Sequence, residues 1–133
     1  MDAQGGGMGR LLVEGLKRAM PEQQVIAVGT NALATSAMLR AGADQGATGE
    51  NAVVVCAAQA DLILAPIGMV LCDAMLGEVT AAMACAVGKS PAHKILVPVS
   101  RCQATVAGVQ RLSMAEAVER AVAEARARIE EKA

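Results

Sequence analysis

Short apolar runs that alternate with helical stretches are the feature that most constrains the fold of this chain. Strands are expected at Val25–Val28, Asp61–Ala65 and Lys94–Val99, where aliphatic residues follow one another and Gly, Pro or polar residues close the run. Continuous rather than alternating apolar strands are typical of a mostly parallel sheet covered on both faces. The pattern predicts the α/β class and a Rossmann-like three-layer sandwich, in a single domain over residues 1–133.

The helices between these runs are predicted from apolar stripes and capping residues. Helices are expected over Gly9–Met20 and Ala32–Ala41, the second capped by Asn31. Ser113 and Glu116 form a capping box that starts the last helix. Residues 52–59 fit a helix or a strand. Residues 69–76 and 80–88 fit two helical pieces, the second capped by Thr80, and residues 104–109 fit an edge strand.

Charge and composition exclude a nucleic-acid partner. Lys and Arg number 12 against 13 Asp and Glu, which gives a net charge of −1 without a basic cluster. The chain has no Phe, Tyr or Trp, so it lacks the rings on which nucleic-acid bases stack. A core without aromatic residues has to be filled by aliphatic residues, Met and Ala.

The cysteines and the apolar runs predict a cytoplasmic protein with no membrane partner. The four cysteines include no C-x-x-C pair and there is one histidine, so no metal site is expected. Isolated cysteines in apolar runs are typical of small core residues in a reducing compartment. The longest apolar run is interrupted by Pro66, Gly68 and Asp73, and glycines stand where a signal peptide would be apolar.

A glycine-rich stretch opens the chain and leads directly into the first helix. Gly5, Gly6, Gly7 and Gly9 can present backbone N–H groups to a phosphate, the helix dipole favours an anion there, and Arg10 adds positive charge. The spacing misses G-x-G-x-x-G by one position, and Arg10-Leu11 replaces the Lys and Ser/Thr of a nucleotide P-loop. The stretch therefore predicts binding of a phosphorylated small molecule, possible cofactors being a nucleotide or NAD(P).

Ligands of open α/β sheets bind beyond the carboxyl ends of the strands, so residues at three predicted strand ends are further binding candidates. Thr30 and Asn31 are candidates for a ribose or base, and Gly68 and Arg101 for the rest of a ligand. Thr48, Glu50 and Asn51 follow the second helix, which predicts that they lie at the opposite end unless their loop folds over.

No residue pattern in the sequence assigns the chain to one reaction. An NAD(P)-linked oxidoreductase is one alternative, although no carboxylate ends the strand at Val25–Val28 to hold a ribose. A non-catalytic regulatory or assembly module, whose glycines serve tight packing, is another. Glu78, near a helix start, and Cys102, beside Arg101, are the candidate catalytic residues.

Five strings occur in the order DAQGGGMG, GTNALATSAMLRAGADQGATGENA, APIGMVL, MLGEVT and ILVPVSRC. With them the chain, from Asp2 to about Val109, resembles a small bacterial family catalogued as domain of unknown function 3842. The resemblance implies a compact Rossmann-like protein without an assigned activity. Its members typically begin with a short apolar strand that leads into the glycine loop. Here Ala3, Met8 and Arg10 replace the usual Gly, Ile and Lys.

The resemblance also implies that the first, central strand is truncated in this chain and lies upstream of Met1. We expect the 133-residue chain alone to be poorly soluble or partly molten, and an added upstream strand to raise its melting temperature. The Ala- and Met-rich surface of the middle helices favours a homo-oligomer.

Overall fold

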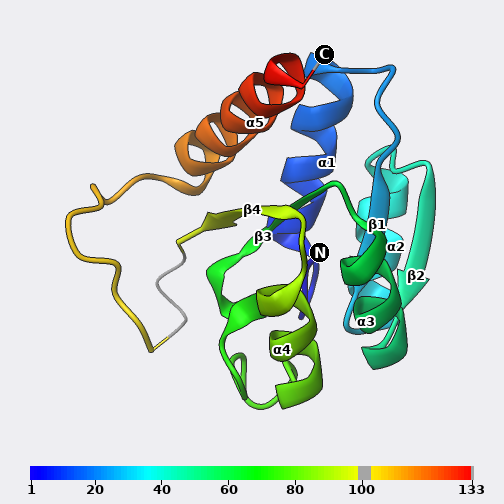
Figure 1. Ribbon diagram of the computed structural model, residues 1–133, viewed down its shortest axis with the longest axis vertical. Helices are drawn as coiled ribbons and strands as arrows, with labels where there is room; N and C mark the ends of the chain where they lie inside the picture. Colours follow the sequence, from blue (N-terminus) through cyan, green and yellow to red (C-terminus); the bar gives the residue numbers. More distant parts are fainter. Residues whose placement is uncertain (99–102, 133) are drawn as a thin grey trace.

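The computed structural model describes residues 1–98 and 103–132 and has the mixed α/β character that the sequence predicts. Within this part, five α-helices and one 3-10 helix accompany short parallel strands in two small sheets (Figure 1). The order is α1 (Gly7–Ala19), β1 (Ile26–Gly29), α2 (Ala32–Arg40), β2 (Gln45–Thr48), α3 (Glu50–Gln59), β3 (Leu62–Pro66), η1 (Ile67–Val70), α4 (Ala81–Lys89), β4 (His93–Val97) and α5 (Met114–Glu131).

Strands β1, β3 and β4 have residues packed on both of their faces. In β1, Ala27 packs with Met38 of α2, whereas the next residue, Val28, packs into the core that contains α3 and α4. In the other sheet, Ile63 of β3 joins that same core, and Ile95 of β4 joins a core formed with α1 and α5. Helix α1 packs against α5, and α3 against α4 (Figure 1). Burial on both faces explains why the strands are continuous apolar runs.

Residues 1–3 lie between the two sheets. The Asp2 N–H donates to the carbonyl of Val28 at 3.0 Å, and the Thr30 N–H donates to the carbonyl of Asp2 at 3.1 Å. These bonds make a parallel bridge between Asp2 and Gly29. On the other side, the Met1 nitrogen donates to the carbonyl of Leu64 in β3 at 2.9 Å. The start of the chain therefore connects β1 to β3.

Strand β2 was not predicted, because its sequence, Gln-Gly-Ala-Thr, has no aliphatic pattern. It forms by pairing with β1 in parallel, from Ile26 opposite Gln45 to Gly29 opposite Thr48. Helix α2 packs tightly over it, since a Cβ at Gly46 would lie 2.9 Å from the Leu39 side chain. Tertiary packing, rather than local propensity, makes this segment a strand.

Three further expectations for local structure are corrected. Residues 69–76 were expected to be helical, but η1 ends at Val70 and turns follow. Residues 104–109 form coil and a turn rather than an edge strand. Cys72 and Cys85 are exposed and Cys56 is only partly buried. The prediction that the cysteines are core residues is therefore wrong for these three.

Several capping predictions are confirmed. The Asn31 side chain accepts from the Ala34 N–H at the start of α2, and Thr80 accepts from the Met83 N–H at the start of α4. The Ser113 hydroxyl accepts from the Glu116 N–H, as the capping box requires. Helix α3 is the helical alternative for residues 52–59, and its N-cap is Gly49.

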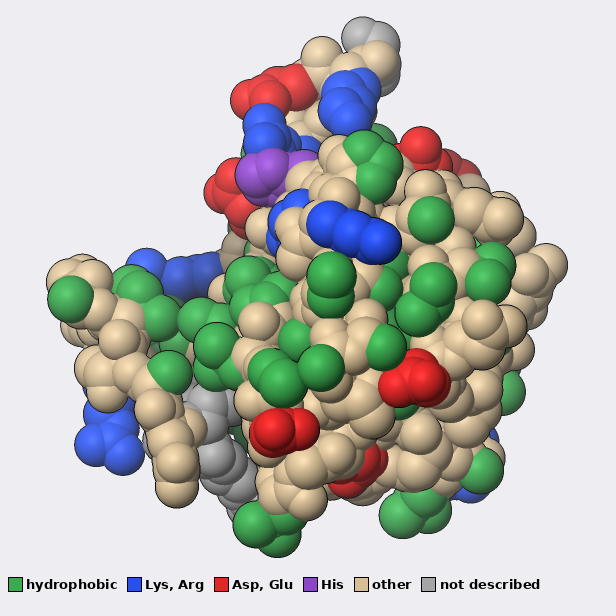
Figure 2. Space-filling model, turned by 60° about the horizontal axis from the view of Figure 1, so that its bottom comes forward, with side chains coloured by type: hydrophobic (Ala, Val, Ile, Leu, Met, Phe, Trp, Pro, Cys, Tyr) green, Lys and Arg blue, Asp and Glu red, His purple; other side chains and the backbone are tan. Residues whose placement is uncertain are grey.

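The surface of the molecule is mixed in character. Figure 2 shows hydrophobic side chains interspersed with acidic ones on the face that comes forward, with Lys and Arg toward its upper and left margins. No helix in the described part of the chain is long and apolar enough to cross a membrane.

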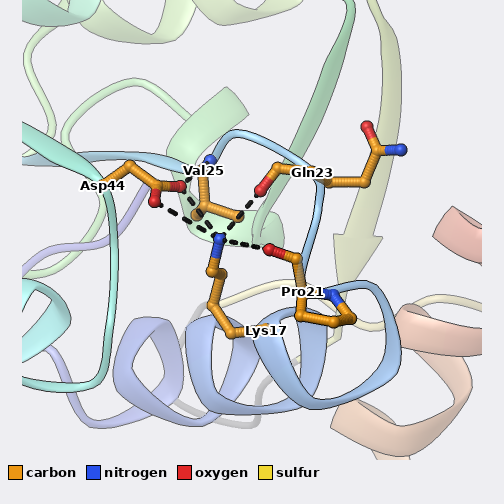
Figure 3. A network of polar contacts seen from close by, with 5 residues as sticks. All are labelled: Lys17, Pro21, Gln23, Val25 and Asp44. Atoms are coloured by element: carbon orange, nitrogen blue, oxygen red, sulfur yellow. Dashed lines mark hydrogen bonds and ion pairs between the residues drawn. The ribbon is translucent and has the colours of Figure 1, made fainter.

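The amino ends of β1 and β2 are tied to α1 by a polar cluster around Lys17 (Figure 3). The Lys17 ammonium donates to the carbonyls of Pro21 and Gln23 at 3.1 and 2.9 Å and to the Asp44 carboxylate at 3.1 Å. Asp44 also accepts from the Val25 N–H at 2.7 Å. The Val25 hydrogen bond, together with Lys17, lowers the pKa of Asp44 below its ordinary value of 3.8.

We expect Asp44→Asn to lower the melting temperature at pH 7, because it removes the negative charge that Lys17 and the Val25 N–H stabilise. A lowered native pKa stabilises the fold above the ordinary value, and this contribution is lost as the pH falls through the native pKa. The difference in melting temperature between the variant and the wild type should therefore shrink below about pH 4. Asp61→Asn, at an exposed aspartate, is the control; an equal effect of both substitutions contradicts the prediction.

Candidate functional site

A cavity of about 790 Å³ lies at the carboxyl ends of β3 and β4. The glycine loop, residues 4–8 ahead of and entering α1, forms one wall, and the segment 104–117 forms the other. Pro66 at the end of β3 and Pro98 after β4 also border it. The volume falls within the range of small-molecule sites, about 300–1,000 Å³.

The N–H groups of the glycine loop divide into engaged and available donors. The Gly6 N–H donates to the Ala3 carbonyl at 3.0 Å, and the Gly9 N–H donates to the Asp2 carboxylate at 2.7 Å. The N–H groups of Gly5, Gly7 and Met8 have no acceptor among the described residues, and all three residues border the cavity. The first turn of a helix leaves such donors free for a ligand.

The glycines also differ in the space that a Cβ atom would find at each position. A Cβ at Gly6 would lie 2.8 Å from the Ala34 backbone, and Gly6 has a φ of +73°. A Cβ at Gly9 would lie 2.6 Å from the Met38 sulfur and 2.8 Å from Asp2. A Cβ at Gly5 or Gly7 would meet no atom of the described residues within 4 Å. Gly6 and Gly9 therefore serve packing, whereas Gly5 and Gly7 leave the cavity wall bare.

Asp2 joins the glycine loop to the helix that follows it. The side chain is buried, and its two oxygens accept from the N–H groups of Ala3 and Gly9 at 2.8 and 2.7 Å. Burial raises the pKa of Asp2, and the nearby Glu78 adds to this, although the two hydrogen bonds oppose it. This role of Asp2 was not predicted; its signal in the sequence was an acidic residue placed next to a helix N-terminus.

Glu78 is the centre of a second polar cluster, at the end of β1. One of its carboxylate oxygens accepts from the Gln4 N–H at 2.7 Å, from the Thr30 hydroxyl at 2.5 Å and from the Asn31 amide at 2.6 Å. Desolvation acts to raise the pKa of Glu78, but the bonds from Thr30, Gln4 and Asn31 outweigh it and lower that pKa. The structure thus brings together Thr30, Asn31 and Glu78; none of the three lines the cavity, but Gln4, which does, bonds to both Glu78 and Asn31.

The remaining predicted residues lie elsewhere. Arg10 forms an ion pair with Glu14 at 2.7 Å and does not line the cavity; Gly68 is buried within η1. Arg101 and Cys102 lie outside the described residues. Arg111, from the segment 104–117, does border the cavity and was not predicted. The one available signal was that it is the only basic residue between Gln103 and Leu112.

The placement of Thr48, Glu50 and Asn51 at the far end was wrong. Because residues 45–48 form β2 parallel to β1, Thr48 lies opposite Gly29 at the carboxyl end. Its hydroxyl donates to Thr35 at 2.8 Å, and Glu50, in the first turn of α3, accepts from the Thr80 hydroxyl at 2.6 Å. No group of three His, Cys, Asp or Glu suited to a metal ion occurs within the described ranges.

We expect Gly6→Ala to destabilise the protein and Gly5→Ala to leave its stability unchanged. The first substitution strains a left-handed backbone and meets Ala34, which should cost about 2 kcal/mol or more. The second adds a methyl group in open space, with an effect within about 0.5 kcal/mol. Urea unfolding of both variants measures this; equal losses would refute the division of the loop.

Glu78→Gln should lower the free energy of unfolding at pH 7 by about 1–3 kcal/mol, because three hydrogen bonds lose a charged acceptor. The native pKa of Glu78 is lowered, so its stabilisation is present above the ordinary value of 4.5 and disappears as the pH falls through the native pKa. Urea unfolding at pH 7 and at about pH 3 should show the gap between variant and wild type closing. If the difference in unfolding free energy between variant and wild type is the same at both pH values, the charge of Glu78 does not stabilise the fold.

Comparison with known proteins shows the family of this chain. Searches among curated proteins and among solved structures each return no match. The model of the family described as Domain of unknown function (DUF3842) matches residues 1–130, in agreement with the resemblance seen in the sequence. Because this match covers nearly the full length, the chain belongs to the DUF3842 family.

Proposed function

We propose that this protein binds a phosphorylated small molecule, such as a nucleotide, in the cavity beside the glycine loop. The observation that carries the proposal is the coincidence of free donors and open space. Gly5, Gly7 and Met8 have N–H groups without an acceptor among the described residues, and the two glycines have no side chain to fill the cavity they border.

The physical chemistry of this wall favours an anion. The N-terminus of a helix carries roughly half a positive elementary charge, and α1 begins at Gly7. Arg111 on the facing wall supplies a full positive charge that can pair with a phosphate. Most other lining residues are apolar or uncharged, among them Pro66, Pro98 and Leu112, which suits the body of a small organic ligand.

The same proposal extends to the fold. Placing residues 1–3 between β1 and β3 gives the strand order β2, β1, residues 1–3, β3, β4, all parallel where they pair. We propose that the two small sheets are halves of one Rossmann-like sheet, with helices α1, α2 and α5 on one face and α3 and α4 on the other. In such sheets the crevice beyond the central strands is the ligand site, and that is where the glycine loop lies.

The packing roles of Gly6 and Gly9 are what the alternative, a non-catalytic regulatory or assembly module, would require. That alternative does not account for Gly5 and Gly7, where a Cβ would have no neighbour within 4 Å among the described residues. A cytoplasmic location and a homo-oligomer remain part of the proposal; exposed Leu33 and Val55, on α2 and α3, would suit a subunit interface.

Gly7→Asp tests ligand binding without endangering the fold. A carboxylate in the first turn of α1 suits the helix dipole, so stability should be kept or raised. The same carboxylate would repel a phosphate and occupy its donors, so affinity for inorganic phosphate, ribose 5-phosphate and AMP should fall at least about tenfold. Isothermal titration calorimetry and thermal unfolding measure the two effects.

Arg111→Gln should weaken the same ligands, and Arg18→Gln should not, since Arg18 is exposed near the other end of α1. A ligand at about 100 times its dissociation constant should stabilise the wild type by about 2.7 kcal/mol. The absence of binding by all three phosphates, or binding that Gly7→Asp leaves unchanged, would reject the proposal.

A further inference from the structure

The two sides of the glycine loop differ in what they leave accessible. On the side of β3 and β4 the loop borders the 790 Å³ cavity. On the side of β1, the donors at the strand end are already bonded to Glu78. If the proposed function holds, this asymmetry limits which ligands the site can take.

Three donors on the β1 side are bonded to Glu78. Its oxygen takes the Thr30 hydroxyl, the Asn31 amide and the Gln4 N–H together, at 2.5–2.7 Å. Asn31 is further committed, since its amide nitrogen also donates to the Gln4 carbonyl and its oxygen caps α2. A ribose or a second phosphate on this side would have to displace a carboxylate and then lie beside its negative charge.

The segment that carries Glu78 is held in place and also shapes the cavity. Val79 is fully buried, and its carbonyl accepts from the Asp73 N–H at 2.8 Å. Between them, Met75 and Leu76 have positive φ angles of 58°, which are uncommon for non-glycine residues. Met75 borders the cavity, so one segment both limits the cavity and delivers Glu78 to the end of β1.

A dinucleotide bound to a Rossmann-like sheet extends across the crevice, with one nucleoside on each side of the glycine loop. Here the cavity lies on the β3–β4 side, and on the β1 side three donors are bonded to Glu78. We propose that the site takes a phosphate monoester with a single ring-sized body on the β3–β4 side, and that Glu78 is the specificity-determining residue that rejects dinucleotides. The phosphate would lie against the Gly5, Gly7 and Met8 N–H groups and Arg111.

The test compares NAD⁺ with nicotinamide mononucleotide and AMP, which are its two halves, and with ribose 5-phosphate, which lacks a base. Isothermal titration calorimetry on the wild-type protein should show that at least one monoester binds and that NAD⁺ binds no more tightly than the best of them. Tighter binding of NAD⁺ than of every monoester would overturn the inference while leaving the proposed function intact. Binding of no probe would overturn both.

Glu78→Ala should open the β1 side, because it frees three donors and removes a negative charge. NAD⁺ should then bind at least about tenfold more tightly than to the wild type, the value of one good charge-assisted hydrogen bond, while the best monoester changes less than about threefold. Glu22→Ala, at an exposed glutamate, is the control and should change neither.

Glu78→Gln covers the case in which Glu78→Ala does not fold, as judged by circular dichroism. It keeps an acceptor for Thr30 and Asn31 but loses the charge, so NAD⁺ should gain affinity in the same direction and by a smaller factor. Unchanged NAD⁺ affinity in whichever folded variant is measured would show that Glu78 does not set the specificity.

Discussion

The buried carboxylate of Asp2 is the contact on which the arrangement of the site depends. Its side chain accepts from the Gly9 N–H at the start of α1, and its backbone pairs with β1 at Val28 and Thr30. The helix N-terminus and the strand end are therefore joined through one residue. Burying this carboxylate is unfavourable, as its raised pKa shows, and the two N–H donors offset part of that cost. With Gly9 held in this way, Gly5, Gly7 and Met8 are left to border the cavity.

A glycine-rich loop can serve tight packing or ligand binding, and the surroundings of the individual glycines distinguish the two roles. Gly6 and Gly9 are required by neighbouring backbone and side-chain atoms, so they would be glycine in a purely structural module as well. A Cβ at Gly5 or Gly7 would meet none of the described residues within 4 Å, and both glycines border the cavity. A ligand supplies a reason for the second pair that packing does not. Glu78, on the other side of the loop, then decides how far that ligand can extend.

The parts of the fold that could be predicted are those with a local cause. The aliphatic runs became β1, β3 and β4, and Asn31, Thr80 and Ser113 cap helices because a side-chain oxygen needs only its own segment to do so. Strand β2 could not be predicted, because its pairing with β1 and the close approach of α2 create it. The site could likewise be predicted only in part. Gln4 and Glu78 are 74 residues apart in the sequence, and no local pattern indicates that they are in contact.

The central claim is that the free N–H groups of the glycine loop bind phosphate, and residue-resolved NMR addresses it most directly. A ¹H–¹⁵N titration of the protein with ribose 5-phosphate reports on each amide separately. The account predicts the largest shifts at Gly5, Gly7 and Met8, because their N–H groups are available, with Gln4, Thr30 and Asn31 changing little behind Glu78. Shifts that are absent from the loop, or that are centred on Thr30 and Asn31, would contradict it.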